Sequence, residues 1–89
     1  MAPISGVAVG IVSDANDPAG RGRVRVRVPA VNEASEAWAP TLTAPGASGP
    51  ETGYREGDEV LVAFEHGDAR KPYVLGLLWS GKDTPPAQR

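Results

Sequence analysis

The stretch GDEVLVAFEHGDARKPYVLGLLW, residues 57–79, decides the fold of this chain. Its first half, VLVAF at 60–64, carries apolar side chains at both sets of alternate positions. Its second half, PYVLGLLW at 72–79, does the same and is rich in β-branched and aromatic residues. This pattern indicates two strands joined by a polar turn. Strands that are apolar on both faces need cover on both sides, which either barrel closure or other subunits would provide.

Three further strands are predicted upstream of this hairpin. Residues 6–13 place Val7, Val9 and Ile11 on one face, and Gly10 in mid-strand suggests a bend or a close backbone approach. Residues 22–28 read GRVRVRV, with valines inward and arginines outward, and Pro29 ends that strand. A third strand is expected at 37–43, at a sheet edge or bulge because it contains Pro40. The predicted core residues are Val9, Ile11, Val24, Val26, Val60, Val62, Phe64, Val74 and Leu75.

The composition favours a small all-β domain. The chain has 89 residues with 11 Gly and 9 Pro, and long amphipathic helical runs are absent. Five short strands separated by turns predict a five-stranded Greek-key OB-fold barrel over residues 1–79, with an SH3-like barrel as the alternative because periodicity does not give strand order. Residues 80–89 are expected to form a polar tail or linker, and 44–56 a long Gly/Pro-rich loop.

Charge and cysteine content exclude several classes of protein. The formal net charge is −2, so there is no overall positive field to attract nucleic acid or anionic lipid. The chain has no cysteine, which removes disulfides, thiolate metal sites and a cysteine nucleophile. The first residues resemble no signal peptide, and no apolar run approaches the ~18 residues of a membrane span. We therefore expect a soluble chain without stable membrane anchoring.

The arginine row is the main candidate site. Arg23, Arg25 and Arg27 share the outward face of one predicted strand. Three interpretations are open: a basic groove for single-stranded nucleic acid, a solvated strand face, or an interface in which arginines pair with carboxylates. The acidic balance and the shortage of free aromatic residues count against nucleic acid. Asp58, Glu59 and Glu65 are the expected carboxylate acceptors.

No catalytic, cofactor or metal site is predicted. His66 is the single histidine and is expected to be a turn residue, since neither a nucleophile nor further metal ligands stand at workable spacing. The run from Asp14 to Asp17 departs from a calcium loop where Pro18 and Ala19 stand. Glycine forms no phosphate-binding motif. We therefore expect a protein that is not an enzyme.

Three segments together resemble a known family. These are GIVSDANDPAGRGRVRVRVP (10–29), EAWAPTLTAPGASG (36–49) and GDEVLVAFEHGDARKPYVLGLLWSGKDTPP (57–86). Their combination is similar to the OB-fold domain of contractile-tail spike proteins, the phage baseplate assembly protein V and VgrG-like group of phage tails, type VI secretion and extracellular contractile injection systems.

The resemblance implies a structural role. It implies a homotrimer on the tail axis, between the tail hub and a membrane-piercing β-helical needle or tip protein, with room for effector cargo. It also implies assembly in the bacterial cytoplasm as part of a phage tail or injection particle, compatible with later delivery outside the cell. On this basis the residues expected at a subunit or hub interface are Arg23, Arg25, Arg27, Trp38, Tyr54, Arg55 and Trp79.

Two departures from the family pattern bear on that expectation. The segment GPETGYREGDEV (49–60) is shorter than is common in the family, and Tyr54 is its lone aromatic. The chain also stops at Arg89, before any needle repeat. We expect either an excised domain or a minimal component that recruits a separate needle.

Overall fold

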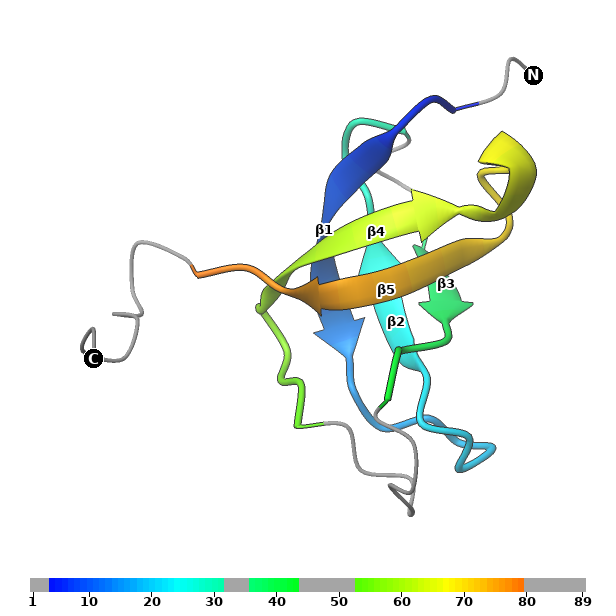
Figure 1. The fold of residues 1–89 in the computed structure, drawn as a ribbon. Helices are drawn as coiled ribbons and strands as arrows, with labels where there is room; N and C mark the ends of the chain where they lie inside the picture. The colour runs from blue at the N-terminus through cyan, green and yellow to red at the C-terminus, as the bar shows by residue number, and fades with distance from the viewer. Residues whose placement is uncertain (1–3, 32–35, 44–52, 80–89) are drawn as a thin grey trace.

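The computed structural model describes residues 4–31, 36–43 and 53–79. All the regular structure there is β, apart from one short 3-10 turn (Figure 1). The elements are β1 (Val7–Asp14), β2 (Val24–Arg27), β3 (Glu36–Ala39), β4 (Glu59–Phe64), η1 (Glu65–Gly67) and β5 (Pro72–Leu77). These strands agree with the predicted ones to within a few residues at each end.

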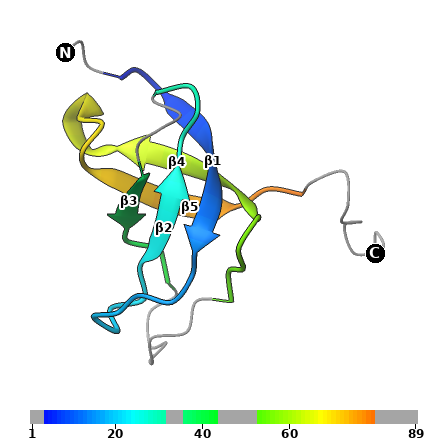
Figure 2. The ribbon, with the colours of Figure 1, turned by 180° about the vertical axis from the view of Figure 1, so that it is seen from behind.

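The five strands form one antiparallel sheet in the order β3-β2-β1-β4-β5. The sheet curls until its two edges meet, as the two opposite views show (Figures 1 and 2). A parallel bridge between Thr41 and Val74 joins the edges. There the Val74 N–H donates to the Pro40 carbonyl (2.9 Å) and the Leu42 N–H donates to the Val74 carbonyl (3.4 Å). The strand order, together with this parallel closure between β3 and β5, is that of the predicted five-stranded OB-fold rather than of an SH3-like barrel.

The core inside the curled sheet is built from small aliphatic side chains. Partly buried residues, among them Tyr54 and Phe64, pack against it. Valine suits such a site because its branched side chain fills a pleated surface with one preferred rotamer. The fully buried residues are Val12, Val24, Val26, Val28, Ala39, Val60, Val62 and Val74. The predicted core positions Val24, Val26, Val60, Val62 and Val74 are thereby confirmed.

The predicted inward face of β1 is wrong. Val9 is 47% exposed and Ile11 is half-buried, whereas Gly10 and Val12 are buried. A strand that is apolar on both faces does not reveal which face turns inward, and a one-residue error moves every side chain to the other side. Gly10 faces the core, where a Cβ would lie only 3.0 Å from Val62 Cγ2, so this inward position is suited to glycine. The close approach predicted for this glycine is confirmed.

Leu75 is also outside the core. It is 39% exposed, and the β4–β5 register shifts between Leu61 and Val62, which adds one residue to β5 opposite this point. A bulge of this kind leaves the extra residue unpaired and re-aims its side chain. Phe64 lies half-buried at the edge of the core rather than at its centre.

Pro72 lies where the sequence predicted it, and β3 is an edge strand as predicted, but the strand stops before Pro40 rather than containing it. Pro40 ends β3 and is followed only by the isolated bridge at Thr41. Pro72 is the first residue of β5, where its missing N–H costs least. The tail at 80–89, most of the loop at 44–56 and part of the connector before β3 lie outside the described residues.

Candidate functional site

The loop between β1 and β2 is organised by the carboxylate of Asp17. It accepts hydrogen bonds from the backbone N–H groups of Ala19 (2.9 Å), Arg21 (3.1 Å) and Arg23 (3.3 Å). The Arg23 guanidinium adds two more, from Nε (2.8 Å) and Nη2 (3.0 Å). Only 3% of the Asp17 side chain is exposed. The Asp-Pro turn therefore ties the loop to the start of β2.

The Asp17–Arg23 pair fixes the first arginine of the row. The bidentate bond to Arg23 is the main reason that the pKa of Asp17 lies well below its ordinary value of 3.8. The guanidinium also lies 5.9 Å from the centre of the Trp38 ring, within cation–π range. Arg23 thus joins the loop to β3.

The second arginine is also held within the chain. Arg25 Nε lies 3.0 Å from Glu36 Oε1, and Ser13 Oγ donates to the same oxygen (2.9 Å). Within the chain, Arg23 and Arg25 thus pair with Asp17 and Glu36. Pairing with Asp58, Glu59 or Glu65 across an interface stays a prediction. Arg27 is half-buried opposite Glu36 in the β2–β3 register. Partners of the same chain account for most of the positive charge of the row.

A cleft of about 280 Å³ lies beside Trp38 at the start of β5. Two of its cations carry carboxylate partners, since Arg23 pairs with Asp17 and Arg70 Nη2 lies 2.9 Å from Asp68 Oδ2. The third cation of the cleft is Lys71. The cleft also contains an acid, Glu65, whose carboxylate accepts a hydrogen bond from the Tyr73 hydroxyl. The cleft is lined by Arg23, Trp38, Pro40, Glu65, Arg70, Lys71, Pro72 and Tyr73. This balance does not provide the basic groove on which a nucleic acid strand depends.

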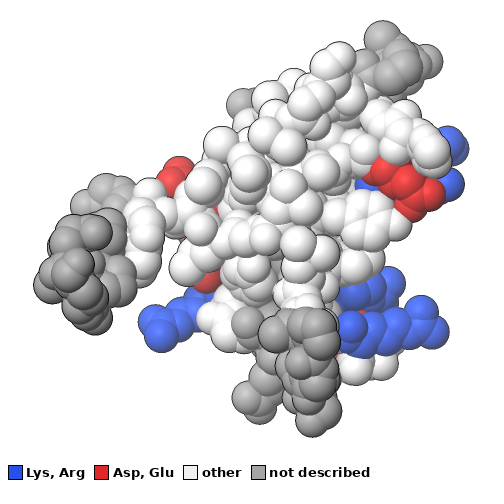
Figure 3. Space-filling model, viewed as in Figure 1, with Lys and Arg blue, Asp and Glu red and all other residues white. Residues whose placement is uncertain are grey.

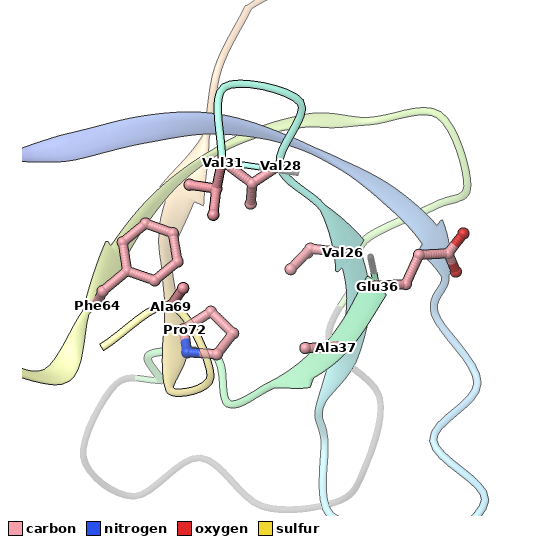
Figure 4. Close-up of a pocket in the computed structure, with 8 residues that line it drawn as sticks. All are labelled: Val26, Val28, Val31, Glu36, Ala37, Phe64, Ala69 and Pro72. Atoms are coloured by element: carbon pink, nitrogen blue, oxygen red, sulfur yellow. The ribbon is translucent and has the colours of Figure 1, made fainter. Parts of the chain in front are cut away.

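A second hollow opens at one end of the barrel and is almost entirely apolar (Figure 4). Phe64 and Pro72 face Val26 and Val28 across it, and Glu36 points away from its centre. Its volume is about 40 Å³. Small-molecule sites usually occupy roughly 300–1,000 Å³, so this hollow is an imperfectly filled end of the core.

The other residues expected at an interface do not gather at one site. Trp38 lines the cleft at the start of β5, whereas Trp79 follows the end of that strand and is 55% exposed. Tyr54 packs partly against the core, and burial followed by the charge of Asp58 raises its pKa. Arg55 is exposed, and its N–H donates to Asp58 Oδ2 (2.8 Å).

Turn chemistry explains His66, as the sequence predicted. It is exposed in η1 with a φ of 53°, a left-handed conformation. Across the ranges 4–31, 36–43 and 53–79, no group of three or more His, Cys, Asp or Glu residues is placed to hold a metal ion. Within the same ranges, no helix has the length and hydrophobicity that crossing a membrane requires.

The outer face of β1, β4 and β5 is the least charged part of the described surface. Val7, Val9 and Leu75 are exposed on it or at its borders, with Leu61 and Ala63 half-buried between them. In the view that looks onto β4 and β5, most of the described surface is uncharged, and charged side chains lie around the rim (Figure 3). Sequence analysis noted that these strands were apolar on both sides but assigned Val9 and Leu75 to the core.

Comparison with protein families now places this barrel. Residues 8–79 match the family described as the type VI secretion system/phage-baseplate injector OB domain. The chain belongs to this family. The match includes all of β2 to β5 and nearly all of β1, and thus confirms the predicted resemblance. Among curated proteins, no sequence matches the chain closely enough to count as a relative.

The injector OB domain therefore has a structural role in a phage tail or secretion spike. A polar cluster with five hydrogen bonds to one carboxylate, Asp17–Arg23–Trp38, holds a loop onto its barrel. Sequence analysis considered Asp17 only as a calcium ligand and missed this part. The Asp-Pro dipeptide indicated a turn organised by the Asp17 side chain, but not that Arg23 is its partner.

Removing the Asp17 charge should loosen this loop. We expect Asp17→Asn to lower the Tm by roughly 5–10 °C, because one amide oxygen cannot replace a carboxylate that accepts five N–H bonds. Asp14→Asn is the matched control, since Asp14 accepts one such bond, from the Asn16 N–H (2.8 Å). Thermal melts followed by circular dichroism measure both, and equal losses would contradict the special role of Asp17.

Two carboxylates with lowered pKa values, one of them that of Asp17, predict how the stability of the barrel changes at acidic pH. Asp17 and Asp68 both have a pKa lowered by arginine hydrogen bonds, that of Asp68 to about 2. The unfolded chain binds these protons more readily, so the stability is present above pH ~4 and is lost as the pH falls. Urea melts between pH 5 and 2 should show a steep decline for the native chain and a shallower one for Asp17→Asn. Parallel curves for the two proteins would contradict this linkage.

Proposed function

We propose that this injector OB domain is a non-enzymatic, homotrimeric neck that joins the tail hub to a membrane-piercing needle. The observation that carries the proposal is the family match over residues 8–79, which spans essentially the whole barrel. In this proposal the domain has a VgrG-like or baseplate protein V-like position in a contractile injection system, and the same match supports it. Such a particle is assembled in the bacterial cytoplasm before it acts outside the cell.

The size of the core supports self-association. The buried side chains of the described residues are seven valines, one alanine and Pro72, with no buried leucine, isoleucine or aromatic ring among them. A domain of this length buries only ~60–65% of the surface that its unfolded chain exposes. Oligomerisation is a common way to stabilise domains of this size.

The arginine row suits contact with the hub. Arg25 remains 47% exposed although it pairs with Glu36. An exposed guanidinium held by one carboxylate retains N–H donors for a second acceptor. In this proposal Arg25, Arg27 and the Arg23–Trp38 pair form the surface that meets the hub, while trimer contacts lie elsewhere.

The native mass in solution tests the proposal. Light scattering after size-exclusion chromatography should give three times the chain mass of 9.2 kDa at micromolar concentrations. A mass of one chain at every concentration reached would overturn it. A parallel filter-binding titration with single-stranded DNA should show no salt-sensitive binding, and micromolar affinity that falls steeply with salt would favour a nucleic-acid role instead.

A further inference from the structure

The outer face of β1, β4 and β5 exposes several large apolar side chains, which a sheet face in contact with water usually lacks. Val7 is 51% exposed at one border, and Leu75 is 39% exposed at the other. Leu77 is exposed too, but it opposes the buried Val60 and therefore points to the other side of β5. Trp79 lies just beyond β5 and extends this border. Most large exposed apolar side chains of the described residues therefore belong to β1, β5 or the residues next to β5.

Charge is almost absent from these three strands. Asp14 at the end of β1 and Glu59 at the start of β4 are their charged residues, and Glu59 pairs with Ile11 at that same end of the sheet. The opposite wall, β2 and β3, carries Arg25, Arg27 and Glu36. Figure 3 shows the resulting contrast between an uncharged middle and a charged rim.

The extent of this surface fits a contact between proteins. The largest apolar patch of a typical monomer covers roughly 300–600 Å². Val7, Val9 and Leu75, which are 39–51% exposed, approach the lower end of that range. A standard interface buries about 800 Å² on each partner. With the half-buried Leu61 and Ala63 added, the face is large enough to act as the centre of such an interface.

The occupant that fits best is a second copy of this chain. A highly charged partner would find almost no counter-charge on these strands, so the complementary surface must also be apolar and uncharged. This chain offers such a surface in two separate strips. The β1 border (Val7, Val9) and the β5 border (Leu75) flank β4, two strand spacings or about 10 Å apart.

We propose that the β1 border of one copy packs against the β5 border of the next, so that three copies close into a ring with β4 nearest its axis. This inference rests on the homotrimer proposed above and adds which surfaces meet. A closed ring of three requires unlike surfaces in contact, and the two borders are unlike strips of one face. Leu61 and Ala63, which present less exposed area, then lie where three copies converge.

Disulfide trapping tests the pairing of the two borders. The chain has no cysteine of its own, so introduced thiols act alone. After mild oxidation, Val9→Cys/Leu75→Cys should run as a covalent trimer on a denaturing gel. The two cysteines of one chain lie across β4, too far apart for an internal disulfide, which needs Cα atoms within ~7 Å. Each single variant should remain a single chain, whereas a mixture of the two should give a dimer.

A charge placed on the face gives an independent readout. Leu75→Lys should reduce the mass from three chains to one while leaving the circular dichroism spectrum unchanged, because Leu75 lies outside the core. Ala19→Lys adds the same charge on the exposed β1–β2 loop and should remain trimeric. If Leu75→Lys is also trimeric, or if single-cysteine variants form dimers, the assigned surfaces are wrong although the trimer stands. A native chain that is monomeric would overturn both proposals.

Discussion

Replacement of Val62 by Asp is expected to leave the chain unfolded at 25 °C. Val62 is fully buried in the middle of β4, paired with Ala8 of β1 and Val74 of β5. An ionised carboxylate buried there without a partner costs several kcal/mol, and protonation to avoid this cost is itself unfavourable at pH 7. Small domains have only about 5–15 kcal/mol of stability in total.

The measurement is far-UV circular dichroism together with the amide dispersion of a proton NMR spectrum. Val62→Ala is the milder companion and should fold with a loss of about 2–3 kcal/mol, through the methyl groups removed and the space they leave. The matched control is Val9→Asp, next to Val62 on the β1–β4 ladder but on the outer face. It should remain folded and lose self-association. If Val62→Asp melts cooperatively near the native temperature, the inward face of β4 has been misassigned.

Replacement of Gly10 by Val is expected to destabilise the barrel although valine is the better strand former. Strand propensities span only ~1 kcal/mol, whereas overpacking a tight core costs about 1–3 kcal/mol. At Gly10 the added Cβ alone would lie 3.0 Å from Val62 Cγ2 and 3.4 Å from both the Arg27 carbonyl oxygen and Val28 Cγ2. The steric cost therefore wins, and the Tm should fall by roughly 5–20 °C.

A double-mutant cycle isolates this contact. Gly10→Ala introduces only the Cβ, and Val62→Ala removes the methyl group that it would meet. The cost of Gly10→Ala should be smaller in the Val62→Ala background, with a coupling of about 0.5–1 kcal/mol. Urea unfolding of the four proteins gives the coupling directly. Strict additivity would mean that the strand shifts and that the close approach is not maintained.

Much of the barrel could be predicted from local sequence. Alternating valines in GRVRVRV (22–28) indicate which side of β2 is buried, because the intervening arginines leave a single choice. Pro40 and Pro72 mark a strand end and a strand start, since neither can donate to a ladder. The family followed from motifs spread over most of the chain, and the match over 8–79 confirms it.

The roles of Arg23 and Asp17 were harder to predict. The sequence shows a row of arginines but not that two of them form ion pairs with carboxylates of the same chain. Asp17 lies six positions before Arg23, and only the folding of the loop brings the carboxylate within 2.8 Å of the guanidinium. Whether such an ion pair forms depends on the course of the loop backbone, and the number of residues between the two partners does not specify that course.

The sequence by itself determined that the chain forms five β-strands, roughly where they lie, and that β1, β4 and β5 are apolar on both sides. Only the tertiary structure decided that Gly10 turns inward while Val9 and Leu75 turn outward. Alternation has a period of two, so it separates the faces of a strand without telling which is the inner one when both are apolar. The close approach of Gly10 to Val62 and the bulge in β5 fix which residues face the core, and the remaining apolar residues of these strands form the outer face.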